Sequence, residues 1–299
     1  MPLVPFLDLM AEAESGGYAV GYFESWNLES LLAVADAAET THSPVLLGFS
    51  GIYLPHPDRE RIDPLATYAA LGLEVCRGLS IPATLVFNES PHRAWVQEAI
   101  RLGFGLVMFS DENLALPEQT EMVMQIAAEA HQAGAAIEGE AATLPGVGGD
   151  LKDAPPRAHK TDVSTARTFV AQTGVDAFAV NIGQMHFHGR REVRLDLDRL
   201  ADLRAALDVP LVLHGASSVH PGDMQEAICR GIRKINVGSA LKQAYFEALR
   251  DACIAVRKPY NPYEVVGSGL SADVLMAGRL ALQRRVEEWM HLFGSAGQA

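Results

Sequence analysis

Short apolar runs alternate with longer amphipathic segments along almost the whole chain. The runs have the length and composition of buried strands, and the segments between them carry apolar residues at helical spacing. The predicted strands lie at residues 18–23, 44–50, 81–87, 104–109, 133–140, 177–182, 210–213 and 234–237. The predicted helices lie at residues 28–41, 64–79, 117–131, 164–174, 196–207, 221–230, 239–256 and 271–293, with a further helix starting at Ser90-Pro91 and a short amphipathic segment at 5–15.

Strands that alternate with helices in this way form a parallel sheet, and eight of them predict closure into a (β/α)8 TIM barrel. The chain then has an additional C-terminal helix, and residues 1–299 form a single domain. An open doubly wound sheet is the alternative, but no GxGxxG motif follows the first strand.

Composition narrows the functional classes. The formal net charge is −13, which argues against nucleic acid and anionic membrane surfaces as partners. The three cysteines show no CxxC spacing, so neither a disulfide framework nor a cysteine metal site is indicated. The N-terminus lacks a signal-like pattern, and no uninterrupted apolar stretch is long enough for a membrane span. We therefore expect a soluble, cytoplasmic protein.

Polar residues stand where several predicted strands end. The run 210–213 leads into His214, and the run 177–182 is followed by His186. In a barrel the C-terminal strand ends converge on one mouth, where active sites lie. The barrel would gather these side chains there although they are far apart in sequence: Ser50, Asn88, Glu89, Glu140, His186, His214 and Ser239.

Two histidines and a carboxylate form a common ligand set for a catalytic divalent metal. The candidates are His186, His214 and Glu89, with Glu140 as an alternative or additional oxygen ligand. His188 is close enough in sequence to act in the same site. The alternative interpretation is that His214 caps a core strand and that Glu89 is a solvated residue at a helix start.

Small residues after the last two strands predict an anion site. Gly215, Ser217, Gly238 and Ser239 could offer backbone N–H groups and hydroxyls to a phosphate, as loops at this place in barrels often do. Tight turns that need small residues are the alternative. Arg190, in a small basic cluster, is a further candidate for binding the substrate.

Collinear motifs over almost the whole chain resemble the class II ketose-bisphosphate aldolase family, the metal-dependent fructose- and tagatose-bisphosphate aldolases. The motifs are GYAVGYF (17–23), NLESLLAVADAAE (27–39), SPVLLGFS (43–50), AIRLGFGLVMF (99–109), TGVDAFAVNIG (173–183), PLVLHGASS (210–218), GIRKINVGSAL (231–241) and LFGSAGQA (292–299).

The resemblance implies a barrel that forms a homodimer or homotetramer and binds a small sugar phosphate. It also implies a divalent metal, with zinc as the expected ion and Mn, Fe or Co as alternatives, that stabilises an enediolate of dihydroxyacetone phosphate. By position, His186 and His214 match zinc ligands, and Glu140 matches a glutamate that can bind metal. Gly215, Ser217 and Ser239 match residues of the phosphate loops. Asn236 matches a residue that contacts the substrate.

The chain departs from the family pattern at the residues that carry out catalysis and bind the metal. Asn88 replaces an aspartate that exchanges a proton with the substrate, and an amide cannot perform general acid–base catalysis. Glu89 replaces a zinc histidine, and Glu24 replaces an asparagine. The loop glutamate that moves a carbon-bound proton has no counterpart closer than Asp150. Two smaller changes accompany these: Phe187 for glycine and Ser110 for aspartate.

We therefore expect a metal-dependent aldehyde-lyase that cleaves or forms a C–C bond in a phosphorylated ketose, with a non-standard substrate or altered acid–base residues. Its proton transfers would have moved to Glu24, His188 or Asp150. Two alternatives remain open from sequence. The protein could be a non-catalytic sugar-phosphate-binding homologue or partner subunit, or a metal-dependent isomerase or epimerase.

Overall fold

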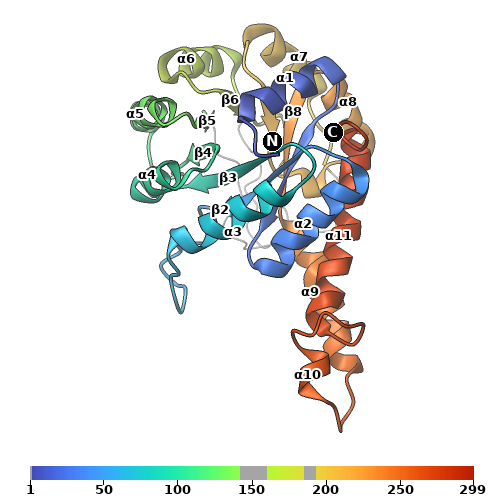
Figure 1. Ribbon diagram of the computed structural model, residues 1–299. Helices are drawn as coiled ribbons and strands as arrows, with labels where there is room; N and C mark the ends of the chain where they lie inside the picture. The colour runs from blue at the N-terminus through green and yellow to red at the C-terminus, as the bar shows by residue number, and fades with distance from the viewer. Residues whose placement is uncertain (1, 142–159, 185–192) are drawn as a thin grey trace.

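Eight parallel strands close into a barrel in the order β1 to β8. This confirms the predicted TIM barrel. The computed structural model, drawn in Figure 1, describes residues 2–141, 160–184 and 193–299. The strands are β1 Val20–Ser25, β2 Val45–Ser50, β3 Ala83–Ser90, β4 Leu106–Phe109, β5 Ala136–Glu140, β6 Ala177–Val180, β7 Leu211–Leu213 and β8 Ile232–Val237.

The helices surround the barrel and continue beyond it. They are α1 Phe6–Gly16, α2 Leu28–Thr41, α3 Leu65–Gly78, α4 Arg93–Leu102, α5 Leu116–Gln132, α6 Val163–Thr173, α7 Leu197–Ala206, the 3-10 turn η1 Ala216–Ser218, α8 Pro221–Cys229, α9 Ser239–Ala255, α10 Pro262–Val265 and α11 Val274–Phe293. Helix α11 confirms the predicted C-terminal helix, whereas α10 was not predicted. None of the helices in the described parts of the chain is long and apolar enough to cross a membrane.

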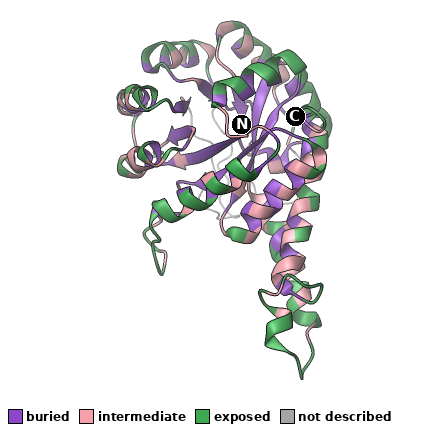
Figure 2. Cartoon of the chain, viewed as in Figure 1, coloured by how far each residue is buried: buried purple, intermediate pink, exposed green. Residues whose placement is uncertain are grey.

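The barrel interior is divided into an apolar lower part and a polar mouth. Inward-facing Val20, Leu46 and Val86 form one apolar cluster with Phe6 and Leu9 of α1, so this helix closes the N-terminal end of the barrel. Figure 2 shows the buried strands inside and the exposed outer faces of the helices. Because strand side chains alternate in direction, the inward positions two residues further along face the mouth, and these are polar on several strands.

One predicted helix start was wrong. Strand β3 continues through Ser90, whose carbonyl accepts a hydrogen bond from the Ser110 N–H at 3.0 Å, and α4 begins only at Arg93 with His92 as its N-cap. The pairing with β4 keeps Ser90 extended, and an extended backbone at that position delays the helix. The predicted limits also shift slightly elsewhere: β1 runs to Ser25, and β6 ends at Val180.

The last helices form an arm. Figure 1 shows α9 and α11 side by side, extending away from the barrel with α10 at the far end. The other end of α11 packs on α2 and the barrel, where the ring of Phe293 stacks on that of Phe23 with centroids 6.2 Å apart. The chain terminus is therefore joined to the first strand.

Candidate active site

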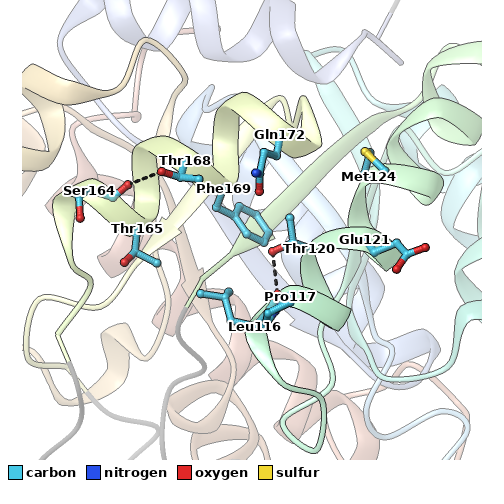
Figure 3. Close-up of a pocket in the computed structure, with 10 residues that line it drawn as sticks. All are labelled: Leu116, Pro117, Thr120, Glu121, Met124, Ser164, Thr165, Thr168, Phe169 and Gln172. Carbon is cyan, nitrogen blue, oxygen red and sulfur yellow. Dashed lines mark hydrogen bonds between the residues drawn. The ribbon is translucent and has the colours of Figure 1, made fainter.

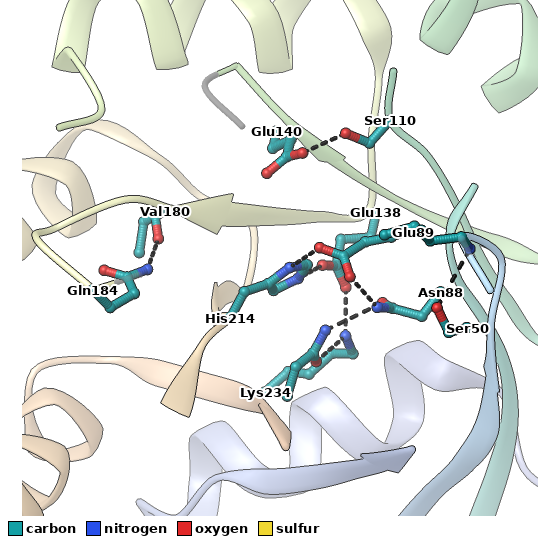
Figure 4. Close-up of polar contacts among 12 residues, drawn as sticks. Ser50, Asn88, Glu89, Ser110, Glu138, Glu140, Val180, Gln184, His214 and Lys234 are labelled. Carbon is teal, nitrogen blue, oxygen red and sulfur yellow. Dashed lines mark hydrogen bonds and ion pairs between the residues drawn. The ribbon is translucent and has the colours of Figure 1, made fainter. Parts of the chain in front are cut away.

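Six side chains form a closed ring of polar contacts at the barrel mouth, called the polar ring below. Glu89 contacts Nδ1 of His214 at 2.8 Å, and Glu138 contacts Nε2 at 2.5 Å (Figure 4). The other carboxylate oxygen of Glu138 lies 2.7 Å from Nζ of Lys234. Nζ of Lys234 in turn donates to Oδ1 of Asn236 at 2.6 Å.

Asn88 completes the polar ring. Its Oδ1 accepts from Nδ2 of Asn236 at 3.1 Å, and its Nδ2 donates to Oε2 of Glu89 at 3.0 Å. Both polar atoms of the amide are therefore engaged in holding neighbours. Asn88 orients Glu89 and Asn236 but offers no titratable group, as the sequence indicated.

Glu89 is the member of the ring that reaches toward solvent. Its side chain is 13% exposed, whereas those of His214, Glu138 and Lys234 are fully buried. Glu89 has φ 48°, in the left-handed region, and the β3–β4 register shifts between Phe87 and Ser90. Strand alternation alone would direct Glu89 away from Asn88. The irregular backbone instead lets both side chains join the polar ring.

The charges of the polar ring stabilise one another. Burial alone would lower the pKa of His214, but the carboxylates of Glu89 and Glu138 raise it to about 10. Burial would raise the pKa of Glu138, but Lys234 and His214 reverse this effect and lower it. The two carboxylates thus lie against the imidazole of His214 and, for Glu138, also against Nζ of Lys234.

The ring contains four of the residues predicted for the site: Asn88, Glu89, His214 and Asn236. Two other predicted residues, Glu140 and Ser50, lie at the ends of β5 and β2. Glu140 accepts a hydrogen bond from Ser110 at 2.5 Å. Ser50 is buried at the end of β2, where its Oγ accepts from the Ile52 N–H at 3.3 Å.

The predicted anion loops lie side by side. Gly215 has φ 64°, a conformation that glycine adopts without strain, and leads into η1. Oγ of Ser217 accepts from the N–H of Ala240 at 3.3 Å, which ties this turn to the first turn of α9. Gly238 and Ser239 begin that helix.

Glu24 lies at the end of β1 beside the anion loops. Its Oε1 contacts Nζ of Lys242 at 2.5 Å. Its Oε2 would lie 2.5 Å from a Cβ on Gly238, so the carboxylate occupies the space that a side chain there would need. Four predicted site residues fall outside the described residues: Asp150, His186, His188 and Arg190.

The surroundings of His214 suit a metal ligand. Metal-binding histidines commonly donate their second ring N–H to a carboxylate, which fixes the ring, and Glu138 is placed to do this for His214. Nδ1 then faces Glu89, a second oxygen donor. A cation bound at Nδ1 would have to replace the proton that the imidazole shares with Glu89. The ligand role of Glu89, His214 and His186 stays a prediction, and His186 is not among the described residues. Within the described chain, no group of three or more His, Cys, Asp or Glu residues is arranged to hold a metal ion.

Three residues facing the site were missed as candidates. Glu138 and Lys234 belong to the polar ring, and Asn181 follows β6 in line with the inward-facing Ala177 and Ala179. Asn181 is 1% exposed, and no hydrogen-bond partner of its Nδ2 is found among the described residues. The signal was present in the sequence: these polar residues stand at alternate positions in or just after apolar runs.

A separate groove lies on the outer surface between α5 and α6 (Figure 3). Its volume is about 700 Å³. The lining includes Leu116, Met124 and Phe169, and none of the predicted site residues contributes to it. The groove is therefore distinct from the barrel mouth.

The fold and the mouth define a (β/α)8-barrel protein with a charged, largely buried site at the C-terminal strand ends. The sequence profile of the fructose-bisphosphate aldolase class-II family matches residues 4–298. The chain belongs to this family and is an aldolase-type lyase.

Individual relatives agree with this assignment. A 6-phospho-5-dehydro-2-deoxy-D-gluconate aldolase of Shouchella clausii (strain KSM-K16) is 29% identical over 100% of this chain and 97% of its own length. A sulfofructosephosphate aldolase of Alkalicoccus urumqiensis is 28% identical over 97% of this chain and 96% of its own length. The crystal structure of the YdjI aldolase from Escherichia coli K12 superposes with a TM-score of 0.82, at 26% identity, over 99% of both chains.

Proposed function

We propose that the protein is a metal-dependent aldehyde-lyase that cleaves or forms a C–C bond in a phosphorylated ketose. The observation that carries the proposal is the placement of His214 between Glu138 and Glu89, which fits a cation held at the exposed side of the polar ring. Glu89, His214 and His186 would hold the ion. A divalent ion at this place would polarise the oxygens of the ketose.

The remaining side chains of the site orient the proposed ligands and transfer protons. Glu138 keeps the imidazole of His214 in one orientation, and Lys234 keeps Glu138 ionised by its charge. Asn236 and Asn88 hold Glu89 in place through two amide hydrogen bonds. Among the described residues, Glu140 is the carboxylate that we assign to proton transfer, because it lies at the C-terminal end of β5, at the barrel mouth, and accepts a hydrogen bond from the Ser110 hydroxyl.

The substrate class follows from the relatives and from the loops. Both named relatives act on phosphorylated substrates, one a gluconate derivative and the other a sulfo-sugar. The turn at Gly215–Ser217 and the start of α9 at Gly238–Ser239 are suited to a phosphate group. We propose that the phosphate binds there. The whole chain would act as one cytoplasmic domain in a homodimer or homotetramer.

The direct test is an assay for aldol cleavage with defined metal content. The protein is stripped with a chelator, reloaded separately with Zn, Mn, Fe or Co, and supplied with a panel of ketose phosphates, including the substrates named for the two relatives. We expect metal-dependent release of a triose phosphate. A complete absence of cleavage across metals and substrates would contradict the lyase proposal.

The ligand role of Glu89 has its own test. Glu89→Ala should lose bound metal and activity together, because a neutral methyl group provides no oxygen donor. Glu12→Ala, an exposed change on α1 at the opposite end of the barrel, is the matched control and should keep both. Metal retained at full occupancy in Glu89→Ala would show that Glu89 is not a ligand.

A further inference from the structure

A second charged group lies at the barrel mouth beside the anion loops. Lys242 projects from the first turn of α9, and its Nζ contacts Oε1 of Glu24 on β1 at 2.5 Å. The same Nζ lies over two aromatic rings, 4.3 Å from the centroid of Tyr53 and 5.6 Å from that of Trp26. Three loops of the mouth, those after β1, β2 and β8, thus converge on one ammonium group.

The position of Lys242 in the first turn of α9 explains where its ammonium group lies. Side chains on a helix tilt toward its N-terminus, so a lysine in the first turn of α9 reaches back over the start of the helix. Trp26 is itself held, because its ring meets that of Tyr245 edge to face with centroids 5.6 Å apart. The aromatic faces attract the cation and limit its orientation.

The ion pair between Lys242 and Glu24 is partly accessible to solvent, so another anion can take the place of the carboxylate. The side chain of Lys242 is 38% exposed and that of Glu24 is 14% exposed, so the contact faces the mouth and is not sealed in the core. Ion pairs of such exposure contribute little net stability, because water and the side-chain entropy offset most of the attraction. A stronger anion can therefore replace the carboxylate at modest cost.

Glu24 already occupies the position of an anion. Its second oxygen lies against Gly238, where a Cβ would be only 2.5 Å away, and the neighbouring Ser217 is bonded to the same helix turn. A carboxylate thus rests on the lysine and next to the two loops that are suited to phosphate. The contact satisfies Lys242 in the absence of ligand.

We propose that Lys242 binds the phosphate group of the substrate and that Glu24 is an internal carboxylate that this phosphate displaces. The inference rests on the proposed function, because it names the residue that recognises the charged end of that substrate. Glu24 also sets selectivity. A phosphate monoester carries close to two negative charges at pH 7 and outcompetes the single charge of Glu24, whereas a substrate carboxylate offers no such advantage.

The test is a phosphate titration by calorimetry, with inorganic phosphate as the probe, and requires no turnover. We expect Glu24→Gln to bind phosphate about tenfold more tightly than the wild type, because the competing charge is gone while the side-chain shape is kept. Lys242→Met should weaken binding by at least about tenfold. The double variant should resemble Lys242→Met, since the gain from Glu24→Gln requires the lysine.

Matched controls are available at the opposite end of the barrel. Glu14 on α1 pairs with Arg204 at 2.9 Å, far from the anion loops, so Glu14→Gln and Arg204→Met should leave phosphate affinity unchanged. Lys242→Gln is a second variant should the methionine disturb the fold, which thermal unfolding monitors.

Two results would overturn the proposal: Lys242→Met with wild-type affinity, or no gain in Glu24→Gln. The aldolase proposal has a separate test. Absence of aldol cleavage would contradict that proposal, whereas the present inference is tested by phosphate binding alone.

Discussion

At Glu89, one unusual backbone torsion decides which side chains the barrel mouth presents. A regular strand would bring Asn88 or Glu89 inward, but not both. The left-handed φ of 48° and the register shift in β3 bring both, and the polar ring then closes. Sequence analysis selected Asn88, Glu89 and His214 correctly as neighbours, but it could not foresee their mutual contacts because alternation gives no information about a bulge.

The coupling between Asn88 and Glu89 makes a prediction for single and double variants. Asn88→Asp removes the donor to Glu89 and places a second carboxylate next to Oε2, which is 3.0 Å away from Nδ2. We expect a loss of about 1–3 kcal/mol in the free energy of unfolding. Asn88→Asp with Glu89→His, the arrangement typical of the family, should recover most of that loss because the like charges are gone.

Urea unfolding of the four proteins in a double-mutant cycle measures this coupling. Additive effects of the two changes would contradict it. The same double variant should gain cleavage of ketose bisphosphates if these two residues account for the altered site. Unchanged activity would direct attention to Glu24 and to the other departures from the family pattern.

At the scale of elements, sequence signals for helix starts were reliable where only residues close together in the chain interact. The helix predicted at residues 28–41 is α2, and Asn27 and Ser30 form a reciprocal capping box at its start. Ser90 and Pro91 carry an equally typical signal, yet the helix starts later because Ser90 still pairs with β4. That pairing joins residues far apart in sequence, so a local pattern cannot contain it.

The capping box of α2 predicts a measurable effect. Oδ1 of Asn27 accepts from the Ser30 N–H at 2.9 Å, and Oγ of Ser30 accepts from the Asn27 N–H at 3.0 Å. Asn27→Ala should lower the free energy of unfolding by about 1 kcal/mol, because a helix N–H loses its acceptor. Asn27→Asp is the conservative comparison and should retain most of the stability, since it keeps the oxygen. Equal stability of Asn27→Ala and wild type in urea titrations would argue against the cap.

At the scale of the whole molecule, the alternating pattern was sufficient to predict the barrel. Inward polar residues such as Lys234 and Glu138 are the exception to that pattern. They interrupt otherwise buried strands at alternate positions, and their partners lie on other strands. Sequence indicated their direction but not their contacts, because the contacts depend on which strands become neighbours when the barrel closes.

The single-domain expectation can be tested through the junction between the two chain ends. Phe293 is 1% exposed and stacks on Phe23, so Phe293→Ala leaves a cavity between α11 and β1. We expect a loss of about 3–5 kcal/mol in the free energy of unfolding. If the barrel and the C-terminal helix form one cooperative domain, amide hydrogen exchange should become faster in β1 as well as in α11. Leu280→Ala, on the same helix but at a side chain that is 43% exposed, should change little. Faster exchange confined to α11 would mean that this helix is a separate unit docked on the barrel.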